Sequence, residues 1–171
     1  ECIENKIILN KVKENFRYLV GTWAYKSKIV KRAFEKPRGY PGDYRMIEDV
    51  YNNQPYSNGI GRCYDVHFLN NPYAIAVRYR KDMLRELLCK FINENSKKTS
   101  IKILNLACGS CREIAELIPT IKYKNHLIFT CIDWDEEALD FSRELFKNLP
   151  LNIKEELLKE DMLTMIKDQK S

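Results

Sequence analysis

The chain has 171 residues, of which 44% are apolar, and its 29 basic and 24 acidic residues give a formal charge of +5. This size and composition fit one ordinary globular domain with a helical addition, and they exclude a largely disordered chain. The charge excess is mild and no stripe of basic and aromatic residues stands out, so we do not expect nucleic acid as a partner.

Residues 1–95 carry the patterns of helices and no strand signal. Apolar residues recur at helical spacing from Asn5 until about Gly21, and a second helix is expected around Ile29 to Phe34. It ends at the Pro- and Gly-punctuated stretch "EKPRGYPGDY", after which Asp43 is placed to cap a helix over 44–51. A short helix follows in "RCYDVHFLNNP", and Asn71 with Pro72 begins a helix of some twenty residues. We therefore predict a helical N-terminal cap region at 1–95.

The chain changes character in residues 96–171. Short apolar runs at 101–106, 126–133 and 151–158 predict strands, and helical patterns lie between them at 112–118 and, capped by Asp135, at 136–149. Strands that alternate with helices through short connections indicate a parallel sheet. The predicted fold class is α/β, a helical N-terminal cap followed by the first three strands of a Rossmann-like sheet.

Ligands of such sheets bind beyond the carboxyl ends of the strands. The first of these ends carries only small residues from Ala107 to Cys111, and Gly109 has the backbone freedom that close approach of a ligand requires. Asp133 ends the second strand, where a carboxylate can accept both hydroxyl hydrogens of a ribose. We predict a nucleotide-type ligand at this edge.

Cys108 and Cys111 have the spacing of a redox dithiol or of half a zinc site. A dithiol enzyme would need a thioredoxin-like arrangement that the rest of the chain does not suggest, and no second close Cys or His pair completes a zinc site. We interpret both cysteines chiefly as small residues of the loop and expect no metal.

The segments "ILNLACGS", "FTCIDWDEEAL" and "LLKEDML" resemble the first three motifs of class I S-adenosylmethionine-dependent methyltransferases. The resemblance implies S-adenosylmethionine as cofactor, its methionine part beside the backbone from Asn105 through Ala107 and Gly109 to Ser110. Asp133 would then hold the ribose, Asp161 and Met162 would contact the adenine, and Trp134 would pack on the adenine face. The loop departs from the family pattern because Asn105 replaces an acid, and Ala107 and Cys111 replace glycines.

The segments "KPRGYPGDYRMIEDVY" and "GRCYDVHFLNNPYAIAVRYRKDML" are similar to a bacterial methyltransferase family linked to biosynthesis of extracellular-factor 3-hydroxypalmitic acid methyl ester. This similarity implies a helical cap that closes over the cofactor and a small-molecule methyl acceptor, with a fatty-acid carboxylate as one candidate.

Within this cap, Tyr40 and Tyr44 are candidates for the closing surface, and Arg78 or Arg80 for pairing with the cofactor's carboxylate. A carboxylate acceptor is already nucleophilic at neutral pH, whereas a hydroxyl or amine acceptor would need a general base, for which Asp43 or His67 could serve.

A complete class I fold has seven strands, so we expect this chain to be the N-terminal part of a longer enzyme, and activity of this part alone is not assumed. The first strand would be an open edge, through which another copy could associate. Two alternatives stay open: a non-catalytic module that binds nucleotide weakly or mediates association, and a nicotinamide-dependent enzyme, disfavoured because "ACGSC" lacks the full three-glycine fingerprint.

Six dispersed cysteines are typical of a reducing compartment, and we expect a cytoplasmic protein. No apolar run approaches the roughly 20 residues that span a bilayer, so we expect no membrane partner. The charged first residues do not resemble a signal peptide.

Overall fold

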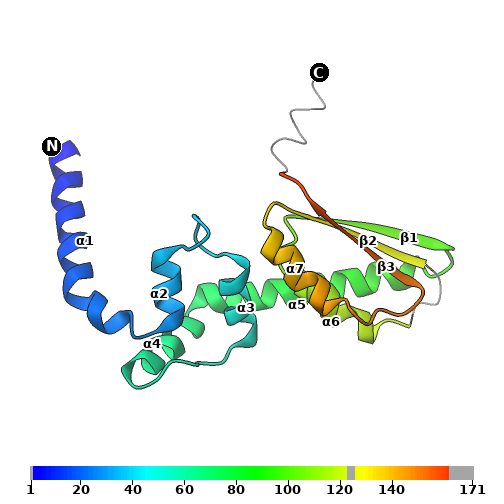
Figure 1. Ribbon diagram of the computed structural model, residues 1–171, viewed down its shortest axis with the longest axis horizontal. Coiled ribbons are helices and arrows are strands. Elements are labelled where there is room, and N and C mark those ends of the chain that lie inside the picture. The colour runs from blue at the N-terminus through cyan, green and yellow to red at the C-terminus, as the bar shows by residue number, and fades with distance from the viewer. Residues whose placement is uncertain (1, 123–125, 162–171) are drawn as a thin grey trace. The chain divides into compact units, whose positions relative to one another are not determined.

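The computed structural model describes residues 2–122 and 126–161, with side chains described from residue 7 (Figure 1). The chain divides into two compact units, Glu1–Val77 and Arg78–Ser171. The first is helical, and the second contains a parallel sheet of three strands, which confirms the predicted α/β fold class. The predicted division between residues 95 and 96 stays a prediction. Among the described residues, every helix is too short or too polar to span a membrane.

The first unit contains α1 (Cys2–Ala24), α2 (Lys28–Glu35), α3 (Tyr44–Asn52), α4 (Ile60–Leu69) and the beginning of α5 (Pro72–Glu94). The first helix is not interrupted at Gly21: α1 continues through this glycine and ends three residues later, at Ala24, near the predicted end. A glycine within a helix costs only about 1 kcal/mol, which the helix around it tolerates. The other helices lie where the apolar spacing predicts them.

Side-chain caps begin three helices of this unit. Asp43 accepts a hydrogen bond of 2.9 Å from the amide of Met46, and Asn71 accepts one of 2.9 Å from the amide of Ala74. Both caps are as the sequence predicts. Ser27 caps α2 through the amide of Val30 and was not foreseen. Each of these oxygens provides an acceptor for an amide that the helix itself leaves unpaired.

A buried carboxylate, Asp65 of α4, holds the first unit together. It is 0% exposed and accepts hydrogen bonds from the hydroxyl groups of Ser27 and Ser57 and from the amides of Tyr56 and Ser57. Burial opposes ionisation, but these bonds outweigh it and lower the pKa of Asp65 below its ordinary value. Asp65 thus joins α4 to the beginning of α2 and to the loop before α4.

Close packing at Gly61 brings α4 against the chain that precedes α2. A Cβ atom added at Gly61 would lie 2.2 Å from the carbonyl oxygen of Lys26, so only glycine fits there. The apolar part of this unit's core is small, formed by Ile29, Val50, Leu69 and Ala74.

The sheet of the second unit has the order β1-β2-β3, with all neighbours parallel. Its elements are β1 (Ser100–Leu106), α6 (Arg112–Leu117), the short 3-10 helix η1 (Ile118–Thr120), β2 (His126–Asp133), α7 (Glu136–Leu145) and β3 (Ile153–Lys159). Asp135 caps α7 by accepting a hydrogen bond of 3.1 Å from the amide of Glu137, as predicted. Strand and helix alternate as the sequence pattern requires.

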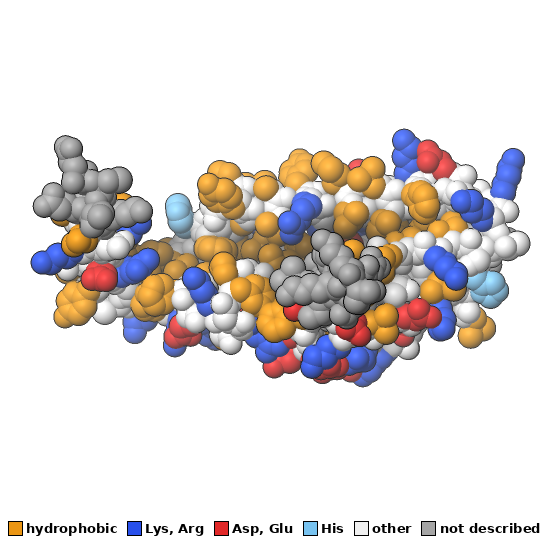
Figure 2. Space-filling model, turned by 90° about the horizontal axis from the view of Figure 1, so that it is seen from above, with side chains coloured by type: hydrophobic (Ala, Val, Ile, Leu, Met, Phe, Trp, Pro, Cys, Tyr) orange, Lys and Arg blue, Asp and Glu red, His pale blue; other side chains and the backbone are white. Residues whose placement is uncertain are grey.

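One face of the sheet carries the core of this unit. The buried residues of that core come from α5, α6, α7 and the strands, and they include Ile92, Ile101, Ile114, Leu117, Leu127, Phe129, Leu139 and Ile153. On the opposite face Leu104, Leu106 and Leu158 are 60%, 49% and 43% exposed. Figure 2, which views the molecule from above the sheet of Figure 1, shows hydrophobic side chains at the surface in this region. In the described sheet β1 is an edge strand.

Candidate functional site

The carboxyl ends of the three strands meet at one edge of the sheet. The loop after β1 is joined to β2 by a hydrogen bond of 3.1 Å from the amide of Cys108 to the carbonyl of Ile132. The end of β3 is joined to β2 by one of 3.1 Å from the amide of Glu160 to the carbonyl of Asp133. This edge therefore brings together most of the residues that the sequence predicts for cofactor binding: Asn105, Ala107, Gly109, Ser110, Asp133, Trp134 and Asp161.

The loop at 107–111 has the backbone of a glycine-rich turn at positions that are not all glycine. The φ angles of Ala107, Gly109 and Cys111 are 51°, 55° and 50°, all in the left-handed region. Ala107 and Cys111 are the two positions where the methyltransferase resemblance expects glycine. The left-handed conformation costs about 1–2 kcal/mol for a residue with a Cβ atom, so the surrounding structure enforces the turn.

The peptide groups of Gly109 are held on two sides. Its amide donates a hydrogen bond of 2.8 Å to Oδ2 of Asp133, and its carbonyl accepts one of 3.2 Å from the hydroxyl of Ser142 in α7. A Cβ atom added at Gly109 would meet no other atom within 4 Å. Asp133 and Ser142 thus hold the peptide groups of Gly109, while the side from which its Cβ atom would project is open, so that a ligand could approach the main chain there.

Asp133 has a structural role that sequence reasoning missed. It is 8% exposed, and its Oδ1 atom accepts a hydrogen bond of 2.9 Å from the amide of Asp135, in addition to the bond of Oδ2 from Gly109. Because each carboxylate oxygen has two lone pairs, both oxygens can still accept a ligand hydroxyl. The ribose-binding role of Asp133 stays a prediction.

Glu113 of α6 is a second residue that sequence reasoning missed. It is 8% exposed and accepts a hydrogen bond of 3.0 Å from the side-chain amide of Asn105. Burial raises the pKa of Glu113, whereas the bond from Asn105 and the charge of Arg80 favour its ionised form. A carboxylate from α6 thus lies beside position 105, where the resemblance expects an acid. The signal in the sequence that could have identified Glu113 is its position, two residues after the end of the loop at Cys111.

The remaining predicted binding residues of this unit differ in exposure. Trp134 is 54% exposed beside Asp133, and Ser110 is buried, only 4% exposed. Asp161 is exposed, Arg78 is half-buried on α5, and Arg80 of the same helix is exposed. Met162 lies outside the described residues. The binding roles of these residues stay predictions.

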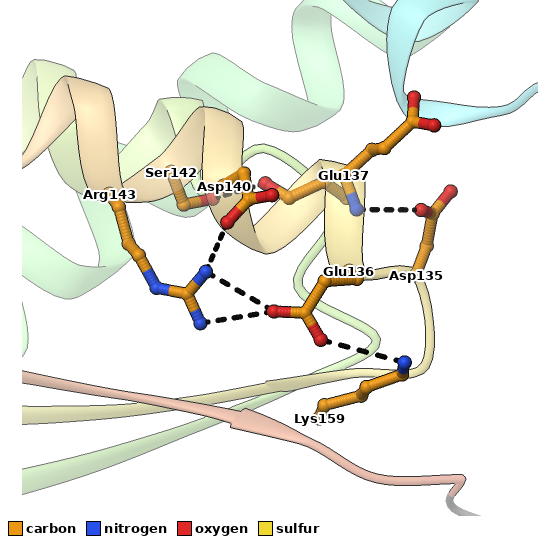
Figure 3. A network of polar contacts seen from close by, with 8 residues as sticks. Asp135, Glu136, Glu137, Asp140, Ser142, Arg143 and Lys159 are labelled. Carbon is orange, nitrogen blue, oxygen red and sulfur yellow. Dashed lines mark hydrogen bonds and ion pairs between the residues drawn. The ribbon is translucent and has the colours of Figure 1, made fainter.

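An ion-pair network joins the end of β3 to the first turns of α7 (Figure 3). Glu136 pairs with Lys159 at 3.5 Å and with Arg143 at 3.2 Å, and Arg143 also contacts Asp140. These side chains are between 45% and 61% exposed, so the network contributes little to stability.

The candidate catalytic residues Asp43, Tyr44 and His67, together with Tyr40, belong to the first unit. Both carboxylate oxygens of Asp43, which is 2% exposed, are engaged: Nε and Nη2 of Arg32 lie 2.9 Å from Oδ1 and Oδ2, and Met46 donates to Oδ1. Tyr44 is buried, and its hydroxyl accepts a hydrogen bond of 3.2 Å from Nε of Arg45. Tyr40 is half-buried and His67 is exposed. Asp43 is placed as a structural carboxylate, and its role as a base stays a prediction.

The cysteines of the loop are buried. Cys108, Cys111 and, in β2, Cys131 are free thiols that pack in the core of the second unit. Within the part of the chain that the structure describes, no group of three or more His, Cys, Asp or Glu side chains is arranged to hold a metal ion. This packing agrees with the interpretation of Cys108 and Cys111 as small residues of the loop.

Comparisons with known proteins agree with this architecture. A solved structure of a possible exported protein from Bordetella parapertussis is similar, with a TM-score of 0.51 and 21% sequence identity over 78% of this chain and 44% of that chain. At this identity the likeness concerns the fold alone, and this chain spans less than half of that protein. No curated protein matches the chain. The family model described as "Putative methyltransferase" matches residues 27–164, which is most of the chain, and the chain therefore belongs to this methyltransferase family.

Proposed function

We propose that this chain binds S-adenosylmethionine at the carboxyl edge of its sheet and serves a class I methyltransferase reaction on a small molecule. The observation that carries the proposal is the loop at Gly109, which has a left-handed backbone, is held by Asp133 and Ser142, and leaves open space within 4 Å of an added Cβ atom. This is a surface on which a ligand can lie against the main chain.

The residues present fit this cofactor. The backbone from Asn105 to Ser110 would lie beside its methionine part, Asp133 would accept hydrogen bonds from the ribose, and Trp134, 54% exposed, would pack on the adenine. Asp161 is exposed near the same edge. When bound, the cofactor supplies an electrophilic methyl group on a sulfonium.

Charge at this edge favours a cationic ligand over a dinucleotide. The buried carboxylates of Glu113 and Asp133 flank the loop, since one accepts a hydrogen bond from Asn105 and the other from Gly109. In a site of low dielectric constant, such carboxylates attract the ammonium and sulfonium groups of S-adenosylmethionine and repel a pyrophosphate. This argument disfavours the nicotinamide-dependent alternative.

Our candidate acceptor is a fatty-acid carboxylate. Such an acceptor needs no general base, which suits a chain in which both oxygens of Asp43 are already engaged by Arg32 and Met46. The protein would then contribute by positioning the two reactants and excluding water, with Tyr40, Tyr44 and Arg78 as the candidate contributors. We place the reaction in the reducing cytoplasm because the cysteines whose side chains are described are free thiols.

Calorimetry on the protein at its natural length tests this function. We expect S-adenosylmethionine and S-adenosylhomocysteine to bind and a nicotinamide dinucleotide not to bind. Gly109→Val should abolish binding, because its side chain would occupy the open space above the loop. Gly59→Val is a matched control, since Gly59 has a φ of 53° against 55° for Gly109 and also has no atom within 4 Å of an added Cβ.

Three outcomes would refute the proposal: no binding of either methyl-cofactor form, tight binding of the dinucleotide, or equal binding by Gly109→Val and the parent. Transfer of a labelled methyl group to long-chain 3-hydroxy acids, compared with their alcohols and amines, tests the acceptor. Cofactor binding without transfer to any acceptor would favour the non-catalytic module.

A further inference from the structure

One face of α1 is apolar and exposed. With 3.6 residues in each turn of a helix, five apolar side chains lie within an arc of about 80° around the helix axis. They are between 58% and 69% exposed: Ile8, Val12, Phe16, Leu19 and Trp23. We call these five residues the α1 stripe. The apolar core of the first unit does not contain them, and the proposed cofactor site does not use them.

The opposite side of α1 attaches the helix to its unit. Gly21 lies about 180° from the middle of the α1 stripe and is buried. Arg17 lies on the same side as Gly21, and its guanidinium is 5.9 Å from the centre of the Phe34 ring of α2. The contact of α1 with α2 is therefore made from the far side of the helix, and the α1 stripe faces away from it.

Basic residues border the α1 stripe on both sides. Lys11 and Lys13 lie about 100° from its middle, in opposite directions, and both are exposed. Glu14 is the only acid among the described side chains of α1, and it lies about 160° from the middle, on the far side. An apolar face bordered by lysines is typical of a helix that lies in a membrane surface. The aliphatic part of each lysine follows the apolar face, and its ammonium reaches the lipid phosphates.

A second copy of this chain suits the α1 stripe less well. Two α1 helices packed stripe against stripe would bring Lys11 and Lys13 of both copies to the borders of the contact, where paired helices usually carry charges of opposite sign. Glu14 lies too far around the helix to compensate them there. These lysines would repel one another in such a pair, whereas anionic headgroups attract all of them. The charges therefore favour a negatively charged surface as the partner.

We propose that α1 binds the surface of a membrane that contains anionic phospholipids, with the α1 stripe at the acyl boundary and Lys11 and Lys13 among the phosphates. The expectation of no membrane partner rests on the lack of a spanning run, which a helix that lies flat in the interface does not need. The methyltransferase family match, residues 27–164, begins after α1 (Cys2–Ala24) and does not account for the α1 stripe. The inference does not depend on the cofactor proposal.

Vesicle sedimentation with the whole chain tests the proposal. The vesicles contain phosphatidylcholine alone, or phosphatidylcholine with phosphatidylglycerol in a two-to-one ratio. We expect much tighter binding to the anionic vesicles, and weaker binding in about 1 M salt, which screens charges more than about 3 Å apart. Lys11→Gln with Lys13→Gln should weaken binding about 30-fold, since each lysine near an anionic surface contributes about fivefold. Glu14→Gln, a charge change in the same helix, is the matched control and should not weaken binding.

Substitution and fluorescence test the α1 stripe itself. Phe16→Gln with Leu19→Gln should abolish binding, whereas Ile7→Gln, which replaces a 61% exposed residue outside the stripe, should not. In a Trp134→Phe background, the emission of Trp23 should shift to shorter wavelength on anionic vesicles, because its indole ring enters the interface. Circular dichroism first checks that each variant folds.

The proposal is overturned by the absence of binding to anionic vesicles, by equal binding of the parent protein and the double lysine variant, or by binding that leaves the emission of Trp23 unchanged. Sedimentation equilibrium without lipid tests the competing partner. A dimer that Phe16→Gln with Leu19→Gln dissociates would assign the α1 stripe to a second copy and would also overturn the proposal. If a variant does not fold, the dependence of binding on lipid charge and on salt in the parent protein decides.

Discussion

Removal of the Asp133 carboxylate should destabilise the second unit, because two backbone amides lose their acceptor. The amide of Asp135 is buried and that of Gly109 is part-buried, at 2.9 Å and 2.8 Å from the carboxylate oxygens. An unpaired buried donor costs about 1–3 kcal/mol, and water can partly replace the acceptor of the Gly109 amide. We therefore expect Asp133→Ala to lower the free energy of unfolding by about 3 kcal/mol. Asp133→Asn keeps one acceptor and should cost about half as much.

Urea denaturation followed by tryptophan fluorescence measures this loss of unfolding free energy in the second unit. The chain has two tryptophans, Trp23 in the first unit and Trp134 in the second. In a Trp23→Phe background, the emission of Trp134 reports the second unit alone. Asp140→Asn is the matched control for Asp133→Asn, since it makes the same chemical change at a carboxylate that is 61% exposed. Its free energy of unfolding should stay within about 0.5 kcal/mol of that of the parent protein.

A loss below about 1 kcal/mol for Asp133→Ala would refute the reasoning that this carboxylate holds the loop. The same variants separate stability from binding. If Asp133 also holds the ribose, then Asp133→Asn, measured well below its unfolding transition, should weaken cofactor affinity about tenfold or more. An unchanged affinity would leave Asp133 with its structural role only.

Three further predictions concern stability. Asp65→Ala should cost about 3 kcal/mol because the buried amide of Ser57 and the part-buried amide of Tyr56 lose their acceptor. Because the pKa of Asp65 is lowered, its contribution to the free energy of unfolding is present above pH of about 4 and is lost as the pH falls through the folded-state pKa. The free energy of unfolding should therefore fall less steeply with decreasing pH in Asp65→Ala than in the parent protein. Equal slopes in the two proteins would contradict this assignment. Gly61→Ala should lower the free energy of unfolding by about 2–3 kcal/mol in urea denaturation, because its Cβ atom would lie 2.2 Å from the Lys26 carbonyl oxygen. Gly21→Ala is the control within α1 and should be close to neutral, because the nearest atom, at 3.1 Å, belongs to the movable ring of Tyr25. Ala107→Gly should raise the melting temperature, because glycine relieves the strain of the left-handed backbone and should add about 0.5–1 kcal/mol to the free energy of unfolding. A lower melting temperature would show that the loop is not strained.

Much of the fold could be predicted because its signals are local. Helix caps at Asp43, Asn71 and Asp135 depend on a side chain that lies within a few residues of the amide it accepts from, and all three are present. The alternation of apolar strands with helices likewise predicts a parallel sheet without long-range information. The first helix passes through Gly21 and ends three residues later, at Ala24, because a single glycine is a weak stop signal that the helix around it tolerates.

The contacts of the candidate site could not be predicted to the same degree, because they join residues far apart in the chain. Asn105 meets Glu113 across the loop, and Gly109 meets both Asp133 and Ser142 from the next strand and helix. Each of these partners could equally face solvent as far as the sequence is concerned. The burial that makes Asp65 a structural centre is likewise a property of packing, since nothing in its neighbours distinguishes it from a surface acid.

The sequence by itself determined the class of the fold, the order of its elements and the edge of the sheet where a ligand would bind, because periodicity, caps and strand polarity are encoded locally. Only the tertiary structure decided that Ala107 and Cys111 adopt the glycine conformation, that Glu113 stands beside Asn105, and that Cys108, Cys111 and Cys131 are buried in one core. The physical reason is that backbone strain and buried polar groups persist only where surrounding contacts hold them, and those contacts form when distant segments pack together.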